Sequence, residues 1–140
     1  MPSLLFPTWM GRFHDLSLLV LRLFVGAFLI WGVWDNITSA ARMKEFEAFL
    51  SGLNCPLPAL AAPVSVWAQF LIGVLLIPGL LTRWAGVVLA FNFLVAVALM
   101  APTGADFRAL YNPAILIFVG LLLAAGGAGR WSLDSRFERR

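Results

Sequence analysis

The sequence predicts an all-α integral membrane protein, a bundle of four membrane-spanning helices with a short amphipathic helix at the membrane interface. Two observations predict it. Of the 140 residues, 61% are hydrophobic and only 12% are charged, and four long apolar runs follow one another along the chain. A helix needs roughly 20 apolar residues to cross a hydrocarbon core of about 30 Å. The chain therefore has room for four spans and little else.

The apolar runs are continuous, whereas the strands of a membrane barrel would alternate apolar and polar residues. A helix also satisfies its backbone amides within its own segment, which the bilayer interior requires. We expect one membrane domain over residues 1–140, with spans at 16–36, 63–81, 84–101 and 109–126 and a basic tail at 127–140. The first run is too long for the apolar part of a signal peptide and is expected to stay as the first helix.

Prolines and glycines predict where the second span begins and ends. We expect Pro63 at its start, because a proline there loses no helical hydrogen bond. Pro78 and Gly79 fall in its predicted last turn and should end it. Only the segment "LTR", residues 81–83, separates this span from the next, which predicts a tight antiparallel hairpin.

The segment over residues 39–53 is predicted to form a short helix in the membrane interface. Its large apolar residues recur at helical spacing, and its charged residues fall between them. Two interpretations are open. The favoured one is a lid that covers the bundle, and the other is a gate over an opening between the first two spans.

The distribution of basic residues predicts the orientation. Four spans place both termini and the 81–83 turn on one side, with six basic residues, whereas the opposite loops hold three. By the positive-inside rule, both termini of this multi-pass protein are then cytoplasmic. The net charge of +3 thus indicates topology and contact with anionic lipid rather than with nucleic acid.

The sequence offers no residues for a cofactor or metal centre. It has one histidine, His14, before the first span, and one cysteine, Cys55, in a proline-flanked loop. These cannot make a bis-histidine haem site, an iron–sulfur site or a zinc site. We therefore assign no catalytic residues and no metal ligands, and any redox centre would belong to a partner subunit or a diffusible carrier such as a quinone.

Arg22 is the charged residue inside the first span, about six residues or roughly 9 Å from its cytoplasmic end. Its side chain could reach back to the headgroups, but Gly26 on the same helix face would let another helix approach, so we favour an inward Arg22. We expect an ion pair with Asp134 of the tail, with Arg83 nearby, fastening the termini to the bundle. The second interpretation is a quinone or anion contact formed by Arg22, Arg83, Arg130 and Asp134.

A second polar group lies toward the opposite end of the spans. Asp35 is 13 residues from Arg22, roughly 20 Å along the helix and on another face, so the two cannot pair. Simple helix termination and headgroup contact is the favoured role of Asp35. The alternative is an outer polar pocket formed by Asp35, Asn36, Trp67, Gln69, Tyr111 and Asn112. Gln69 and Asn92 are expected to act as hydrogen-bonding glue between helices.

Three segments resemble the DoxX family of small bacterial membrane proteins: "LVLRLFVGAFLIWG", "AQFLIGVLLIPGLLTRWAG" and the ending "GAGRWSLD". The resemblance covers residues from about 18 to 134. It implies a four-helix protein of the bacterial inner membrane, in a family linked with quinol oxidase and thiosulfate:quinone oxidoreductase. Relatives commonly carry lysine where Asp35 stands and glutamate where Gln69 stands, so the ion pair open to them is missing here.

The resemblance implies an accessory or anchor subunit of a quinone-linked oxidoreductase complex, with no cofactor ligands of its own and at most a share in catalysis. The alternative is a purely structural or assembly subunit that packs on a larger membrane complex or on itself. That alternative rests on the small-residue faces at Gly26, Gly32, Gly73, Gly86 and Ala90. Transport of a small solute is a weaker third possibility, because no inverted repeat is evident.

Overall fold

The computed structural model describes Leu5 and residues 7–140, and every regular element in this part is helical. The predicted domain of residues 1–140 thus includes residues 1–4 and 6, which lie outside the described part. The elements in chain order are η1 (Thr8–Phe13), α2 (His14–Thr38), α3 (Ala40–Gly52), α4 (Pro58–Leu76), α5 (Thr82–Met100), η2 (Ala101–Thr103), α6 (Phe107–Gly126) and α7 (Leu133–Glu138).

Four helical segments are long and apolar enough to cross a membrane: Thr8–Thr38, Pro58–Leu76, Thr82–Thr103 and Phe107–Gly126. This confirms the predicted all-α, multi-pass membrane protein. The short helix predicted between the first two spans is also present, as α3.

The prediction for the start of the second span was wrong. Helix α4 begins at Pro58, five residues before Pro63, which lies inside the helix. Pro58 is equally suited to the first turn, and the apolar segment that follows it extends the helix without a break. Pro58 rather than Pro63 therefore begins the helix.

Helix α4 ends at Leu76, so Pro78 and Gly79 follow the helix rather than occupy its last turn. The N–H of Leu80 donates to the carbonyl of Leu75 at 2.9 Å, and that of Gly79 to Leu76 at 3.1 Å. Gly79 adopts a left-handed φ of 73°. This is the Schellman pattern, in which a glycine reverses the chain and satisfies the last carbonyls of a helix.

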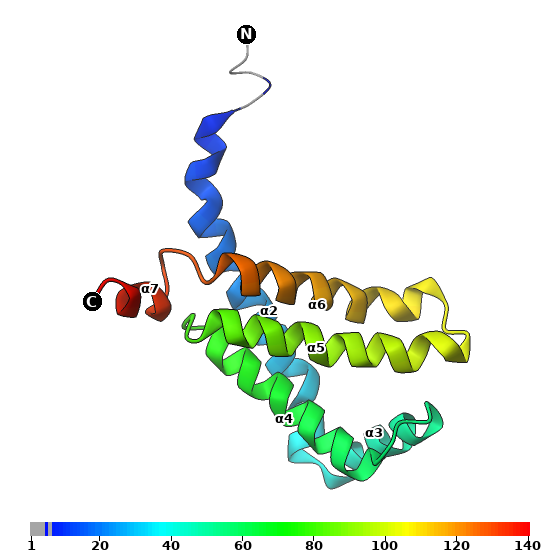
Figure 1. Cartoon of the computed structure of the whole chain (residues 1–140). Coiled ribbons are helices and arrows are strands. Elements are labelled where there is room, and N and C mark those ends of the chain that lie inside the picture. Colours follow the sequence, from blue (N-terminus) through cyan, green and yellow to red (C-terminus); the bar gives the residue numbers. More distant parts are fainter. Residues whose placement is uncertain (1–4, 6) are drawn as a thin grey trace.

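The four spans pack as two close pairs, α2 with α4 and α5 with α6, and α4 joins the pairs by packing on α5. Figure 1 shows α5 and α6 side by side, while α4 meets α5 at their connecting turn and diverges from it toward α3. The predicted hairpin is therefore tight only near its turn. The core draws on all four spans: Leu18, Val25, Leu29, Ile72, Leu76, Ala85, Leu89, Leu116 and Leu123.

Glycines bring the helices of each pair into backbone contact. A Cβ atom on Gly73 would lie 2.7 Å from the carbonyl oxygen of Gly26, and one on Gly86 would lie 2.6 Å from that of Gly120. Such close approach is typical of small residues at membrane helix interfaces. Gly32 differs, because a Cβ there would meet nothing within 4 Å.

We predict that Gly73→Ala lowers the free energy of unfolding by about 1–3 kcal/mol, because the added methyl group must push α4 away from α2. The matched variant Gly32→Ala adds the same group in open space and should not lower stability, because alanine is favoured over glycine in a helix by up to about 1 kcal/mol. Denaturation of the purified protein in mixed micelles measures both. Equal stability of the two variants would contradict the close packing of α2 on α4.

Candidate functional site

Polar side chains gather in two regions, one around the α4–α5 turn and one between the diverging ends of α4 and α5. At the turn, Arg22 of α2 is 0% exposed, which confirms the predicted inward orientation. Gly26, one helical turn along, provides the close approach of α4 that was expected beside it. The guanidinium is thus enclosed where α2 meets the end of α4.

Backbone carbonyls are the partners of Arg22. Its Nη1 donates to the carbonyl oxygens of Leu76 at 3.1 Å and Ile77 at 3.5 Å, and its Nη2 donates to that of Trp131 at 2.5 Å. The carbonyls of Leu76 and Ile77 lie at the C-terminal end of α4, where the helix dipole favours a positive charge. Arg22 therefore joins the end of α4 to the tail.

The predicted ion pair between Arg22 and Asp134 was wrong. Within the described residues the two ion pairs are Arg42–Glu45 and Lys44–Glu47, both on α3. The carboxylate oxygens of Asp134 are engaged elsewhere. Backbone carbonyls bind Arg22 instead of Asp134, and no residue pattern in the sequence indicates which carbonyls these are.

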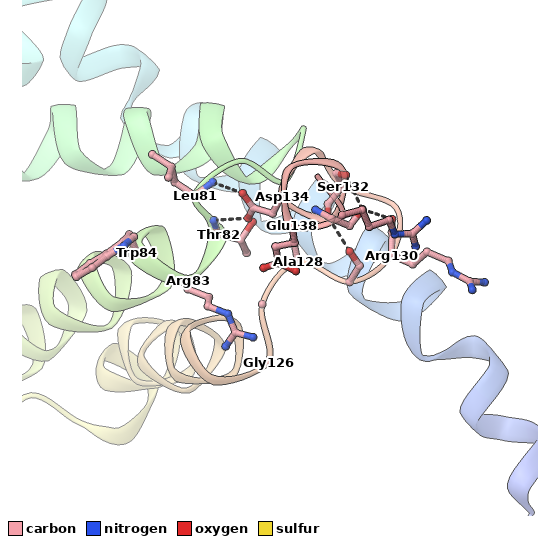
Figure 2. A pocket seen from close by; sticks show the side chains of 14 residues that line it. Leu81, Thr82, Arg83, Trp84, Gly126, Ala128, Arg130, Ser132, Asp134 and Glu138 are labelled. Carbon is pink, nitrogen blue, oxygen red and sulfur yellow. Dashed lines mark hydrogen bonds between the residues drawn. The ribbon is translucent and has the colours of Figure 1, made fainter.

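Asp134 instead caps the start of α5. Its two carboxylate oxygens accept hydrogen bonds from the N–H groups of Leu81 at 2.7 Å and Thr82 at 2.8 Å. Figure 2 shows the carboxylate of Asp134 facing both residues from the tail. A carboxylate at a helix N-terminus satisfies unpaired N–H groups and stabilises the helix dipole. The tail thus contributes to the hydrogen bonding at the end of α4, through Arg22, and at the start of α5, through Asp134.

Further contacts fix the tail. The N–H groups of Leu133 and Asp134 donate to the carbonyls of Pro78 and Gly79, each at 3.0 Å. The N–H of Arg130 donates to Asp15 of α2 at 3.0 Å. A Cβ on Gly79 would overlap the Arg22 guanidinium, so only glycine fits this position. We call this assembly of Arg22, the 77–82 turn and residues 130–134 the clasp.

Arg83 lies beside the clasp and caps α6 by donating to the carbonyls of Ala124 at 3.2 Å and Ala125 at 2.5 Å. Arg83, Arg130 and Asp134 line a cavity of about 430 Å³. Arg22 is not among its lining residues. The structure thus brings three of the four residues of the predicted quinone or anion contact to one cavity.

A larger cavity of about 710 Å³ lies where α4 diverges from α5, and α2 and α3 also contribute to its wall. We call it the wedge cavity. Most of its lining is apolar, and none of the described residues that line it is charged. Its lining residues are Gly32, Val33, Asn36, Phe46, Phe49, Leu50, Leu53, Cys55, Ala61, Val64, Ser65, Val66, Ala68, Gln69, Val88, Phe91, Asn92, Phe93, Val95, Ala96, Leu99, Met100 and Pro113.

The wedge cavity contains two of the six residues predicted to form an outer polar pocket, Asn36 and Gln69. The other four, Asp35, Trp67, Tyr111 and Asn112, are exposed and are not among its lining residues. Neighbours on a helix differ by about 100° in direction, which separates Asp35 from Asn36.

A linked set of polar groups in this cavity was not anticipated as a site. The Ser65 hydroxyl donates to Asn92 Oδ1 at 2.9 Å and accepts from Gln69 Nε2 at 3.1 Å. Asn92 does bond across the helices, to Ser65 of α4, whereas Gln69 bonds to Ser65 within its own helix. The available signal in the sequence was the shared helix face of Ser65 and Gln69, which are four residues apart.

We predict that Arg22→Leu lowers the free energy of unfolding by on the order of 3 kcal/mol, because three carbonyls lose a charged donor in a buried place. The tail should then open more often, and trypsin should cleave after Arg130 at least about tenfold faster. Arg108→Leu, at an exposed position, is the control. An unchanged cleavage rate in Arg22→Leu would contradict the clasp.

We predict that Asp134→Asn costs about 1–2 kcal/mol, because an amide can accept from one of the two capped N–H groups but faces the other with a donor of its own. Thermal unfolding in detergent measures the loss. The matched change Asp35→Asn, on an exposed residue, should have no effect. The capping role is refuted if both variants unfold at the wild-type temperature.

Comparison with known proteins supports the resemblance seen in the sequence. No curated protein and no solved structure matches the chain. The model of the DoxX family matches residues 17–102, more than half of the 140 residues. The matched part includes Arg22, the turn and nearly all of the wedge cavity, and it ends before α6 and the tail. The chain belongs to the DoxX family.

Proposed function

We propose that this protein is an accessory membrane subunit of a quinone-linked oxidoreductase complex. It anchors the complex in the bilayer and supplies part of the wall along which a quinone reaches its site. The observation that carries the proposal is the wedge cavity, which is uncharged, mostly apolar and formed by helices that span the membrane. A lipid-soluble carrier needs such a path between the bilayer and a redox centre.

Partner subunits would hold the redox centres. Among the described residues, no three His, Cys, Asp or Glu side chains gather closely enough to hold a metal ion. The resemblance implies a link between the family and quinone-linked enzymes, so we assign the chemistry of such a complex to its other subunits and the lipid-facing role to this chain.

The wedge cavity is a better candidate for quinone contact than the clasp. Arg22 and Asp134 already bind backbone groups at the clasp, and releasing either would leave helix ends unsatisfied. Gln69 and Asn92 line the wedge cavity and bond only to Ser65, not to a helix end. We retain Arg83 and Arg130 as a proposed anion contact at the smaller cavity.

We further propose that the protein resides in the bacterial inner membrane with both termini in the cytoplasm. The clasp places the tail at the α4–α5 turn and beside Arg22 near the start of α2. The basic residues of the termini and this turn outnumber those of the opposite loops by six to three. The positive-inside rule favours that orientation.

A structural or assembly subunit is the second candidate. Of the small residues expected to form a partner surface, Gly26, Gly73, Gly86 and Ala90 pack within the chain instead. What favours this candidate is α6, the least covered span. Its exposed face carries Phe107, Tyr111, Ile115, Phe118, Leu121 and Leu122, an apolar surface suited to lipid or to a partner helix.

Isolation from the native membrane in mild detergent tests the proposal. We expect a companion subunit with the visible absorption of flavin, haem or iron–sulfur centres, and quinone in the lipid extract. Membranes that lack this chain should reduce added quinone more slowly, and the wild-type gene should restore the rate. An unrelated membrane protein with the same tag serves as the purification control.

Two other results have clear meanings. A colourless preparation with a stoichiometric partner and no quinone would favour the assembly role. A colourless monomer, together with unchanged quinone reduction in membranes that lack the chain, would refute both candidates.

A further inference from the structure

The polar groups of the wedge cavity form a short relay, Gln69–Ser65–Asn92, across α4 and α5. Ser65 occupies the middle and binds one polar atom of each amide. The second polar atom of each amide, Gln69 Oε1 and Asn92 Nδ2, makes no hydrogen bond to the described residues. The relay therefore has two free ends, an acceptor at one and a donor at the other.

The two free ends are also present when both amides are turned over together. Exchanging oxygen and nitrogen in both amides reverses the relay, because the Ser65 hydroxyl has a single proton to donate. One amide then still offers a free N–H₂ group, and the other still offers a free carbonyl. The cavity presents one donor and one acceptor in either case.

The free ends are accessible from the cavity. Among the described residues, the fully buried side-chain N and O atoms without a partner are Arg22 Nε and Thr82 Oγ1. Gln69 and Asn92 are half-buried, so their free atoms retain accessible surface, and both residues line the wedge cavity. A molecule in this cavity can reach them.

The surroundings restrict what that molecule can be. An amide end left without a partner in hydrocarbon is costly, so a polar group of the occupant must meet it. Because no described lining residue is charged, a charged head group would be buried without a counter-ion. The remaining wall, including Phe46, Phe91 and Leu99, suits a hydrocarbon chain. About 710 Å³ is within the usual range for small-molecule sites.

We propose that the wedge cavity binds an uncharged lipid through a carbonyl oxygen in its head group, which accepts a hydrogen bond from the free N–H₂ end of the relay. Two sources share this chemistry, a quinone and the ester of a neutral glycerolipid. The lipid site stands independently, whereas the choice of quinone rests on the proposed function. Ser65 and Gln69 position the Asn92 amide.

Helix α3 forms one wall of the site. Leu50 is buried, and Phe46 and Phe49 line the cavity. Asn36 Nδ2 donates to the carbonyl of Arg42 at 3.2 Å, which holds the start of α3 against α2. Cys55, the only cysteine of the chain, also lines the cavity, so the rate of its modification reports whether the cavity is filled.

The test uses the purified, delipidated full chain in detergent and three decyl- or octanoyl-chain probes. Decylubiquinone and dioctanoylglycerol carry neutral carbonyl head groups, and decyl sulfate carries a charged one. We measure the rate at which a maleimide modifies Cys55 and the number of bound probes by native mass spectrometry. Both neutral probes should slow the modification several-fold, and decyl sulfate should not.

Asn92→Leu removes the head-group donor and should weaken binding of both neutral probes by roughly tenfold, the size expected for one hydrogen bond. Ser65→Ala breaks the relay without adding bulk and should also weaken binding. Asn112→Leu makes the same change at an exposed position outside the cavity and should bind as the wild type does. Thermal unfolding of each variant confirms that it is folded.

The outcomes separate this inference from the proposed function. Binding of dioctanoylglycerol but not decylubiquinone, with loss in Asn92→Leu, would support the lipid site and contradict the quinone role. The inference fails if neither neutral probe protects Cys55, which would leave water as the partner of the relay. It also fails if decyl sulfate protects equally, or if Asn92→Leu and Ser65→Ala both bind as the wild type does.

Discussion

The hydrogen bonds from Arg22 to the end of α4 are the interaction on which the rest of the structure depends. A helix that ends near hydrocarbon leaves carbonyl groups that water cannot reach. Arg22 supplies donors to two of them and to Trp131 of the tail. Because the charge meets the negative end of a helix dipole, it is compensated without a buried carboxylate partner.

The clasp makes the two ends of the molecule different. At the α4–α5 turn, Arg22, Gly79 and Asp134 leave little freedom, since each fits its neighbours through backbone contacts. At the other end, α4 and α5 diverge (Figure 1), and residues of both helices line the wedge cavity. The polar groups at the α4–α5 turn are used to bind helix ends and the tail. The polar groups with unused hydrogen-bonding capacity lie at the other end, where α4 and α5 diverge.

Much of the fold could be predicted because long apolar runs admit few structures in a bilayer. The four spans, α3 and the inward Arg22 all follow from composition and helical spacing. The partner of Arg22 could not be predicted, because backbone carbonyls are present at every residue and only the fold selects three of them. The wedge cavity could not be predicted either, since it arises from the divergence of α4 and α5 rather than from any motif.

The clasp also has a consequence for biogenesis. Trp131 and Asp134 follow the fourth span in the chain, so the ribosome makes them after α2, α4 and α5 have been synthesised. Until then, the guanidinium of Arg22 lacks its tail partner, and the first N–H groups of α5 lack their cap. The final arrangement of the early spans therefore waits for the segment that follows α6, and chains interrupted before that segment would leave these groups without their tail partners.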